Sequence, residues 1–236
     1  GYMGGLSTAK AEALSGLDVE FIGYDTLTGE SKITAIFAEG EPVGHISSGQ
    51  DGEVVLDRTP FYAEAGGQVG DSGDIVGEGF RARVNNTVRL SDSVIAHNVT
   101  VVEGDLSVGD VANARVDEGM RSSTARNHTA THLLQAALRA VLGDHVLQAG
   151  SYVSGDRLRF DFSHPSPVSD SELRKVEDMV TKWILDDFRV KAEVMPIAEA
   201  EEIGAIALFG EKYGNDVRVV RIGDVSAEFC GGTHID

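Results

Sequence analysis

The sequence predicts an α+β fold in two domains: a small antiparallel β-barrel, followed by a domain in which helices cover an antiparallel sheet. Between residues 19 and 116 the strand-like runs are short and are separated by Gly, Asp and Asn turns, which is the spacing typical of a small barrel. After Asp117 helical patterns alternate with strand-like ones. We therefore expect a barrel domain over residues 17–116 and a second domain over residues 117–236. Residues 1–16, rich in Gly, Ala and Ser, are expected to be a linker or an expression remnant, with one short helical segment around Ser7 to Leu14.

Short runs of strand-forming residues are expected to build the barrel. They lie at residues 19–22, 32–37, 53–56, 81–84, 95–101 and 111–116. A glycine-rich segment, Gly66-Gly67-Gln68, falls between the third and fourth runs. On composition alone it is a turn whose backbone needs positive φ, a conformation that glycine adopts without strain.

The longest helical pattern covers residues 124–142. Its apolar side chains recur at helical spacing; they are Leu133, Leu134, Ala137, Leu138 and Val141. Residues 122–124 (Ser-Ser-Thr) offer an N-cap, and Gly143 offers the glycine that often follows a helix. We expect the helix to pack on the core through this apolar stripe.

Shorter elements are predicted in the rest of the second domain. Two strands, 146–148 and 157–162, should pair across Gly155-Asp156. A capping box from Ser169 to Glu172 opens a helix that is expected to end at about Phe188. One face of this helix should hold Leu173, Val176, Val180 and Ile184. The remaining elements are a strand at 190–194, a short helix from Pro196 to Gly204, and strands at 217–222 and 227–230.

Two pairs of metal-ligand residue types mark this domain. His128 and His132 are four residues apart on the predicted helix, which puts them about 40° apart around its axis and about 6 Å along it, so one ion can reach both. Cys230 and His234 offer a thiolate and an imidazole, and Gly231-Gly232 lets the backbone between them turn tightly. These ligand types suit tetrahedral zinc, although an inert buried thiol beside a surface histidine is an alternative. Cys230 is the only cysteine, so an internal disulfide is excluded.

The two ligand motifs, His128-x-x-x-His132 and Cys230-Gly231-Gly232-Thr233-His234, resemble those of the editing domain of alanyl-tRNA synthetase. Further strings typical of that domain follow in its order over roughly residues 17–236; they are residues 59–71, 148–151, 158–164, 209–214 and 217–220. Free-standing alanyl-tRNA editing proteins share many of these strings, whereas the editing domain of threonyl-tRNA synthetase shares only the zinc-ligand pattern. The resemblance implies a β-barrel subdomain followed by a zinc-containing editing core.

The reaction implied by this resemblance is hydrolysis of the ester that joins a wrong amino acid to the 3′ adenosine of tRNA(Ala). Serine is the first candidate amino acid and glycine the second. No Glu lies between His128 and His132, so the metalloprotease signature with its helix-borne base is absent. No segment resembles the class II aminoacylation core, so the chain is not expected to charge tRNA itself.

Polar residues near the ligand motifs are the candidates for the editing pocket. The resemblance places Gln148 where it orients water or substrate, and Thr131 near the hydroxyl of the seryl group. The residues themselves leave other roles open, because the hydroxyl of Thr131 can bond an upstream helix carbonyl and Gln148 can be an ordinary strand residue. The wall of the pocket would be shaped by Glu64, Gly66, Gly67 and Gln68.

The formal charge of -18 argues against a strong general affinity for nucleic acid, since proteins that grip nucleic acid alone are usually basic. Local phosphate contacts are expected from Arg126, Arg139 and Arg159, with Arg121 and Arg157 as further candidates. Arg139 is the first of these, because its spacing puts it on the histidine side of the helix. A few such contacts imply weak binding of tRNA with a shallow salt dependence. The identity of tRNA(Ala) would then be read by the rest of the synthetase chain.

Two other functions stay open on the sequence. The chain could be a free-standing deacylase that edits in trans. It could also be a non-catalytic module, in which zinc with four protein ligands and no open position stabilises the fold while the surface binds RNA. We favour the synthetase domain because residues 19–43 look like the synthetase version and the chain stops two residues after His234. We expect a cytoplasmic protein that does not enter membranes, since there is one cysteine, no secretory signal and no membrane-length apolar run.

Overall fold

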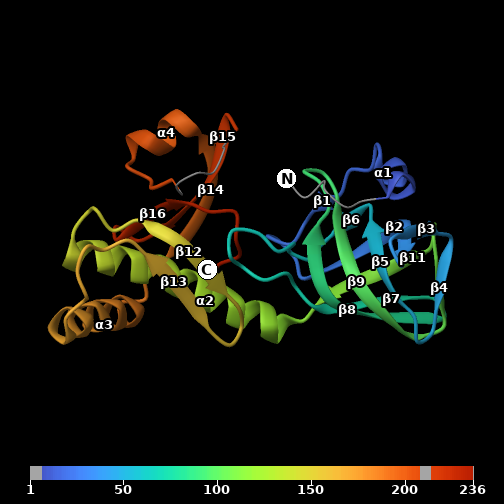
Figure 1. Cartoon of the computed structure of the whole chain (residues 1–236), viewed down its shortest axis with the longest axis horizontal. Helices are drawn as coiled ribbons and strands as arrows, with labels where there is room; N and C mark the ends of the chain where they lie inside the picture. Colours follow the sequence, from blue (N-terminus) through green and yellow to red (C-terminus); the bar gives the residue numbers. More distant parts are fainter. Residues whose placement is uncertain (1–6, 208–213, 236) are drawn as a thin grey trace. The chain divides into compact units, whose positions relative to one another are not determined.

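The computed structural model describes residues 7–207 and 214–235. Its internal contacts divide the chain into two compact units (Figure 1). Unit 1 contains residues up to 65 together with residues 69–121, and unit 2 contains residues 66–68 and 122–236. The segment 66–68 is therefore inserted into unit 2 from the chain of unit 1. The helices and antiparallel sheets described below confirm the predicted α+β class.

Unit 1 is a closed antiparallel barrel. Its sheet runs in the order β11-β7-β8-β9-β5-β2, and an additional antiparallel pairing between β11 and β2 closes it. The barrel strands are β2 (Thr28–Ala38), β5 (Asp51–Leu56), β7 (Gly73–Gly77), β8 (Phe80–Arg89), β9 (Ile95–Glu103) and β11 (Val111–Val116). A short strand, β3 (Glu41–Val43), extends the sheet beside β2. The barrel predicted from the short runs is confirmed.

Alternate side chains of the strands fill the barrel interior. In β8, for example, Phe80, Ala82 and Val84 are buried while the arginines between them are exposed. A second cluster forms where helix α1 (Thr8–Leu14) packs: Leu14 is grouped with Phe37 of the sheet. Part of the segment that we expected to be a linker is thus a helix with a buried side chain.

Two differences from the predicted barrel concern its strands. The run at 19–22 forms only β1 (Glu20–Phe21), which pairs in parallel with β6 (Arg58–Thr59) in a separate two-stranded sheet. The sixth barrel strand is instead β7, which the sequence analysis did not predict, because glycines at both ends leave it little strand propensity. A further two-stranded pair joins β4 (His45–Ser47) to β10 (Asp105–Ser107).

Arg121 forms a buried ion pair in unit 1 with Asp71. Its Nε donates to both oxygens of that carboxylate, at 3.0 and 2.9 Å. Its Nη1 donates to the carbonyl oxygen of Gly23 at 2.7 Å, and its Nη2 to that of Pro60 at 2.9 Å. Asp71 also accepts from the backbone N–H of Tyr62 at 2.8 Å. Arg121 was a candidate for contacting tRNA, but this guanidinium is committed to buried acceptors and is not offered to a phosphate.

Helix α2 (Glu118–Leu142) passes from unit 1 into unit 2. It begins six residues before the predicted start at 124. The reason is Asp117, whose Oδ1 accepts from the backbone N–H of Met120 at 3.1 Å, as an N-cap side chain does. The predicted N-cap residues 122–124 therefore lie inside the helix. Gly143 follows the helix with φ of 115°, as predicted.

Two antiparallel sheets and two further helices complete unit 2. The strands β12 (Gln148–Val153) and β13 (Leu158–Phe162) form a hairpin across Gly155-Asp156, as predicted. The predicted bounds of the first strand, 146–148, were wrong, because β12 begins at Gln148 and continues to Val153. Helix α3 (Asp170–Leu185) carries the predicted capping box on Ser169. A three-stranded sheet has the order β14-β15-β16, with α4 preceding its central strand in the chain. Its elements are β14 (Val190–Pro196), α4 (Ile197–Glu202), β15 (Asp216–Ile222) and β16 (Ser226–Phe229).

One hydrophobic cluster of unit 2 lies between α2, α3 and the β12–β13 hairpin (Figure 1), and a second one lies between α4 and the three-stranded sheet. The α2 stripe contributes Ala137 and Leu138 as predicted. On α3 the packed face is Val176, Met179, Val180 and Trp183. The predicted face was wrong at its ends, since Leu173 and Ile184 are exposed. Most of the string at 209–214 lies outside the described residues. None of the helices in residues 7–207 and 214–235 has the length and apolar character that a membrane span requires.

Candidate metal centre

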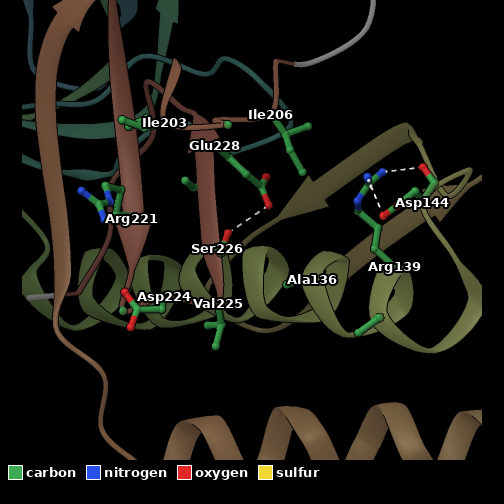
Figure 2. Close-up of a pocket in the computed structure, with 14 residues that line it drawn as sticks. Ala136, Arg139, Asp144, Ile203, Ile206, Arg221, Asp224, Val225, Ser226 and Glu228 are labelled. Atoms are coloured by element: carbon green, nitrogen blue, oxygen red, sulfur yellow. Dashed lines mark hydrogen bonds and ion pairs between the residues drawn. The ribbon is translucent and has the colours of Figure 1, made fainter. Parts of the chain in front are cut away.

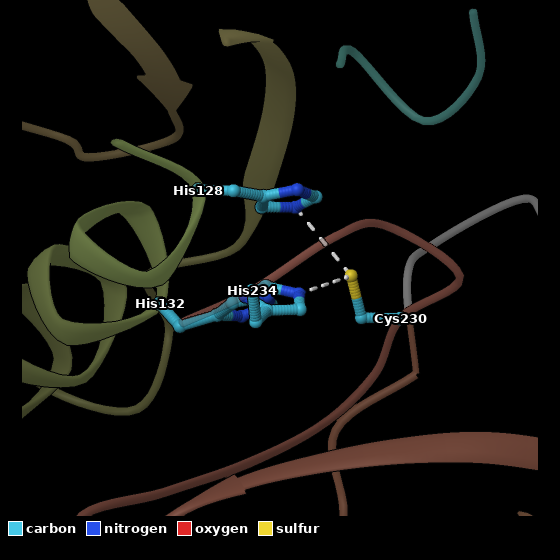
Figure 3. Close-up of side chains that lie close together, drawn as sticks. All are labelled: His128, His132, Cys230 and His234. Atoms are coloured by element: carbon cyan, nitrogen blue, oxygen red, sulfur yellow. Dashed lines mark hydrogen bonds between the residues drawn. The ribbon is translucent and has the colours of Figure 1, made fainter. Parts of the chain in front are cut away.

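Four potential metal ligands converge in unit 2 (Figure 3). His128 and His132 project from α2, and Cys230 and His234 come from the segment that follows β16. The four ligand atoms lie within 4.8 Å of one another. The Sγ of Cys230 is 3.4 Å from Nε2 of His128 and 3.3 Å from Nε2 of His234. The structure thus brings the predicted ligands together.

Each histidine is oriented by a partner at its Nδ1. For His128 this partner is Oε1 of Gln68, at 2.7 Å, and for His132 it is Oε2 of Glu228, at 2.6 Å. Both partner oxygens accept hydrogen bonds, so each Nδ1 carries a proton, and in the neutral ring each Nε2 keeps the lone pair that a metal needs. The Nδ1 of His234 lies 3.2 Å from Oγ1 of Thr129. Such outer partners are characteristic of metal-binding histidines.

The atom whose surroundings best fit a bound cation is Nε2 of His132. It is buried and has no hydrogen-bond partner among the described residues. An orphaned buried nitrogen costs free energy unless something binds it. Three imidazole nitrogens and one thiolate form a donor set typical of zinc, which prefers tetrahedral sites with nitrogen and sulfur ligands. The residues present therefore fit a zinc ion.

The charges of the cluster lead to the same conclusion. Burial raises the pKa of the Cys230 thiol, but the imidazoles around it, those of His128 and His234 in hydrogen-bond contact, outweigh burial and hold that pKa well below its usual value. Burial lowers the pKa of His234 to about 3. Burial also lowers the pKa of His132, but the carboxylate of Glu228 and the thiolate of Cys230 outweigh it and raise that pKa to about 10. The raised pKa of His132 means that the site between Glu228 and Cys230 favours a positive charge, which the imidazolium supplies by itself and which a bound divalent cation would supply in its place.

The backbone between Cys230 and His234 is held against the ligands. Arg218 on β15 donates from Nη1 to the carbonyl oxygens of Cys230 and Gly232, at 2.8 and 2.9 Å. Gly232 packs directly on the His128 ring, because a Cβ there would lie 2.1 Å from Cε1 of that ring. From the sequence, a tight turn was the reason expected for this glycine. In the structure the glycine is needed because the backbone lies directly against the His128 ring.

Replacing Gly232 with alanine is expected to weaken zinc binding by about 10–100-fold, because the added methyl group must displace the His128 ring and disturbing a ligand's support typically costs that much. Competition with a chromophoric chelator measures this affinity. Gly119→Ala is the matched control: its nearest neighbour would be Asp117 at an ordinary 3.5 Å, and it lies on a helix. Wild-type affinity in the Gly232 variant would contradict the packing argument.

The glycine-rich segment, residues 66–68, packs against strand β12. The backbone N–H of Val153 donates to the carbonyl oxygen of Gly67 at 2.8 Å, and the Oγ of Ser151 donates to that of Gly66 at 3.3 Å. Gly67 has φ of 87°, as expected, and a Cβ there would lie 2.3 Å from Oγ of Ser151. The segment carries Gln68 to the metal ligands. The predicted role of these residues in the pocket wall stays a prediction.

The two candidate catalytic residues make local hydrogen bonds. Gln148, the first residue of β12, is partly buried and donates from Nε2 to Oγ of Ser151 at 3.2 Å. Thr131 donates to the carbonyl oxygen of Asn127 at 2.8 Å, which is the helix packing role considered for it above. Glu64 lies in unit 1, where it accepts from Asn86 at 3.5 Å. The catalytic roles of Gln148 and Thr131 stay predictions.

Most of the candidate arginines have partners within their own segments. Arg126 is exposed and donates to Ser122 and Ser123 one turn earlier on α2. Arg159 is exposed on β13 and pairs with Asp161 at 3.1 Å. Arg157 lies over the ring of Tyr152, 5.3 Å from its centroid. These exposed side chains remain candidates for contacting tRNA phosphates.

Arg139 has a structural role. Its Nη1 donates to the carbonyl oxygens of Asp144 and Val146, at 2.7 and 2.9 Å, and so ties the residues after α2 to the helix. It lies at the edge of a cavity of about 450 Å³ between α2 and the turn joining β15 to β16 (Figure 2). Glu228 also lines this cavity, and its Oε1 accepts from Oγ of Ser226 at 3.1 Å. Neither Glu228 nor Gln68 was predicted from the sequence to hold a histidine of the cluster in position.

Comparison with known proteins gives matches at both ends of the chain. Residues 6–120 match the family model of class II tRNA synthetases (A), and residues 217–236 match the second additional domain of threonyl and alanyl tRNA synthetases. An alanine–tRNA ligase of Halorhodospira halophila is 50% identical over 226 residues, which are 96% of this chain and 26% of that protein. One from Carboxydothermus hydrogenoformans is 50% identical over 218 residues, 92% of this chain and 25% of that protein. The chain thus spans about a quarter of the length of these relatives.

Proposed function

The chain belongs to the alanyl-tRNA synthetase family, and we propose that it hydrolyses the ester of mischarged Ser-tRNA(Ala), and secondarily of Gly-tRNA(Ala), at a zinc ion. The ion would be held by His128, His132, Cys230 and His234. The observation that carries this proposal is the convergence of these four side chains, with each histidine turned by an outer partner so that Nε2 faces the cluster.

An open coordination position distinguishes catalytic from structural zinc. His234 is the ligand that we propose to be displaced, because its outer contact to Thr129, at 3.2 Å, is the longest of the three. When bound at such a site, zinc lowers the pKa of a water molecule and polarises an ester carbonyl. The chain's own residues would then position the substrate: the amide of Gln148 orients water or the ester, and the hydroxyl of Thr131 lies near the seryl side chain.

The partner in this proposal is tRNA(Ala), recognised mainly by the remaining three quarters of a synthetase in the cytoplasm. The charge of -18 supports weak binding by this chain alone. Arg126 and Arg159, whose side chains are exposed, are the stronger phosphate candidates. Two alternatives compete: a free-standing deacylase acting in trans, and a structural-zinc module that binds RNA without turnover.

Deacylation of seryl-, glycyl- and alanyl-tRNA(Ala) by the zinc-loaded chain tests the proposal. We expect the seryl ester to be lost fastest, the glycyl ester more slowly and the alanyl ester hardly at all. The absolute rates with this chain alone are expected to be low, because its binding of tRNA is weak. Stoichiometric zinc without turnover of either wrong ester would favour the structural module instead.

Replacing Gln148 with alanine is expected to slow seryl ester cleavage by about 10–100-fold while zinc stays bound, since losing one hydrogen bond to the reacting groups costs about 1–3 kcal/mol. Single-turnover kinetics and elemental analysis measure the two effects separately. Gln50→Ala is the control, because Gln50 is an exposed glutamine of unit 1 whose side chain bonds only to Ser47 among the contacts described. A wild-type rate in the Gln148 variant would remove this residue from the mechanism.

A further inference from the structure

We propose that Gln68 is a positioning residue for the metal, and that its one side-chain amide sets both the orientation of His128 and the path of the Cys230–His234 segment. The inference rests on the zinc site of the proposed function, but not on the identity of the ester. It assigns a role in metal binding to the glycine-rich segment, which the sequence analysis placed only in the pocket wall.

The hydrogen bonds of Gln68 leave one consistent assignment. Its Oε1 accepts from the backbone N–H of Thr233 at 2.9 Å, and its Nε2 donates to the hydroxyl of the same residue at 2.8 Å. The oxygen thus identified also lies 2.7 Å from Nδ1 of His128. Because a carbonyl oxygen cannot donate, Nδ1 must carry the proton. The Nε2 of that ring is therefore left with the lone pair that a metal needs.

The amide is held rigidly in place. Gln68 is 0% exposed, and its backbone forms a parallel bridge with Val153 of β12. The glycine before it cannot be replaced without a clash with Ser151. On the other side, a Cβ at Gly232 would lie 2.8 Å from Oε1 of Gln68. The amide is thus enclosed between β12, the His128 ring and the ligand segment.

One side chain consequently links the two halves of the ligand set. His128 belongs to the helix pair, and Thr233 directly precedes His234 in the C-terminal pair. If the amide were lost, the His128 ring would be free to rotate and the N–H of Thr233 would be buried without an acceptor. Loss of a hydrogen-bonding partner of this kind typically weakens metal binding by about 10–100-fold.

Two substitutions separate positioning from mere packing. Gln68→Leu keeps much of the volume but removes every hydrogen bond. Gln68→Glu keeps an acceptor for His128 and for the Thr233 N–H, and the Thr233 hydroxyl can donate to it in turn. Thr87→Val is the matched control for losing a buried side-chain hydrogen bond away from the cluster. Thr87 is 0% exposed, and its hydroxyl donates to the Asp71 carbonyl oxygen in unit 1.

The readouts are zinc affinity by chelator competition and the tautomer of the His128 ring by nitrogen-15 NMR of the metal-free chain. We expect Gln68→Leu to lose about 10–100-fold in affinity and to mix the two tautomers. We expect Gln68→Glu to stay within about threefold of wild type with the Nδ1-protonated form intact, and Thr87→Val to change neither measurement. Wild-type affinity in Gln68→Leu, or equal losses in Gln68→Leu and Gln68→Glu, would overturn the inference. Failure of the wild-type chain to bind zinc would instead overturn the proposed function.

Discussion

Cys230→Ala is expected to reduce zinc from one ion per chain to none, and to abolish ester hydrolysis with it. The thiolate is the only anionic ligand in the cluster, and its Sγ lies within 3.4 Å of two ligand nitrogens. Its removal leaves three imidazoles and no anionic ligand. Since changes outside the ligand set typically cost about 10–100-fold in affinity, loss of this ligand should cost more than about 100-fold. Elemental analysis after dialysis against a weak chelator measures the stoichiometry.

The control for this experiment is a change at a histidine outside the cluster. His145 is exposed and contacts only His164 among the side-chain bonds described, so His145→Ala should keep one zinc per chain. His132→Ala should behave like Cys230→Ala, because both remove a ligand of the same cluster. Unchanged zinc content in Cys230→Ala would show that the metal, if bound, lies elsewhere in the chain.

The metal ligands could be predicted from sequence because their spacing is itself geometric. Two histidines one helical turn apart must share a face, and the closely spaced Cys230 and His234 form a second local pair. The supports of these ligands could not be found in this way. Gln68 and Glu228 act through contacts that only the tertiary fold creates, the former across 60 residues to His128 and the latter across 96 to His132.

The barrel was predicted from strand-like runs, but its strand β7 was not, because hydrogen-bonded pairing with neighbouring strands outweighs the low strand propensity of its residues. The segment Gly73–Gly77 has little local strand signal, yet both of its edges are paired, to β8 and to β11. The start of α2 was missed for a similar reason. Residues 118–123 show no apolar stripe. The helix extends through them because the side chain of Asp117 caps it and the guanidinium of Arg121 donates to the carbonyl oxygen of Gly23.

Arg121→Met is expected to destabilise unit 1 by about 3–5 kcal/mol, the usual cost of removing one partner of a buried ion pair. Both side chains of the pair are nearly inaccessible, at 7% for Arg121 and 5% for Asp71. The change would leave the carboxylate of Asp71 uncompensated, and the carbonyl oxygens of Gly23 and Pro60 would each lose a donor. Hydrogen exchange of the barrel amides measures the loss within unit 1 itself.

The same substitution on the barrel surface provides the comparison. Arg81 pairs with Asp74 at 3.1 Å, but its side chain is 47% exposed, so Arg81→Met should cost at most about 1 kcal/mol. Adding Asp71→Asn to Arg121→Met should recover part of the loss, because the buried charge disappears while an acceptor remains for the Tyr62 N–H. If Arg121→Met cost no more than Arg81→Met, the buried pair would contribute no more than a surface one. The five hydrogen bonds of Arg121 would then not be what holds the segments at Gly23, Pro60 and Asp71 together.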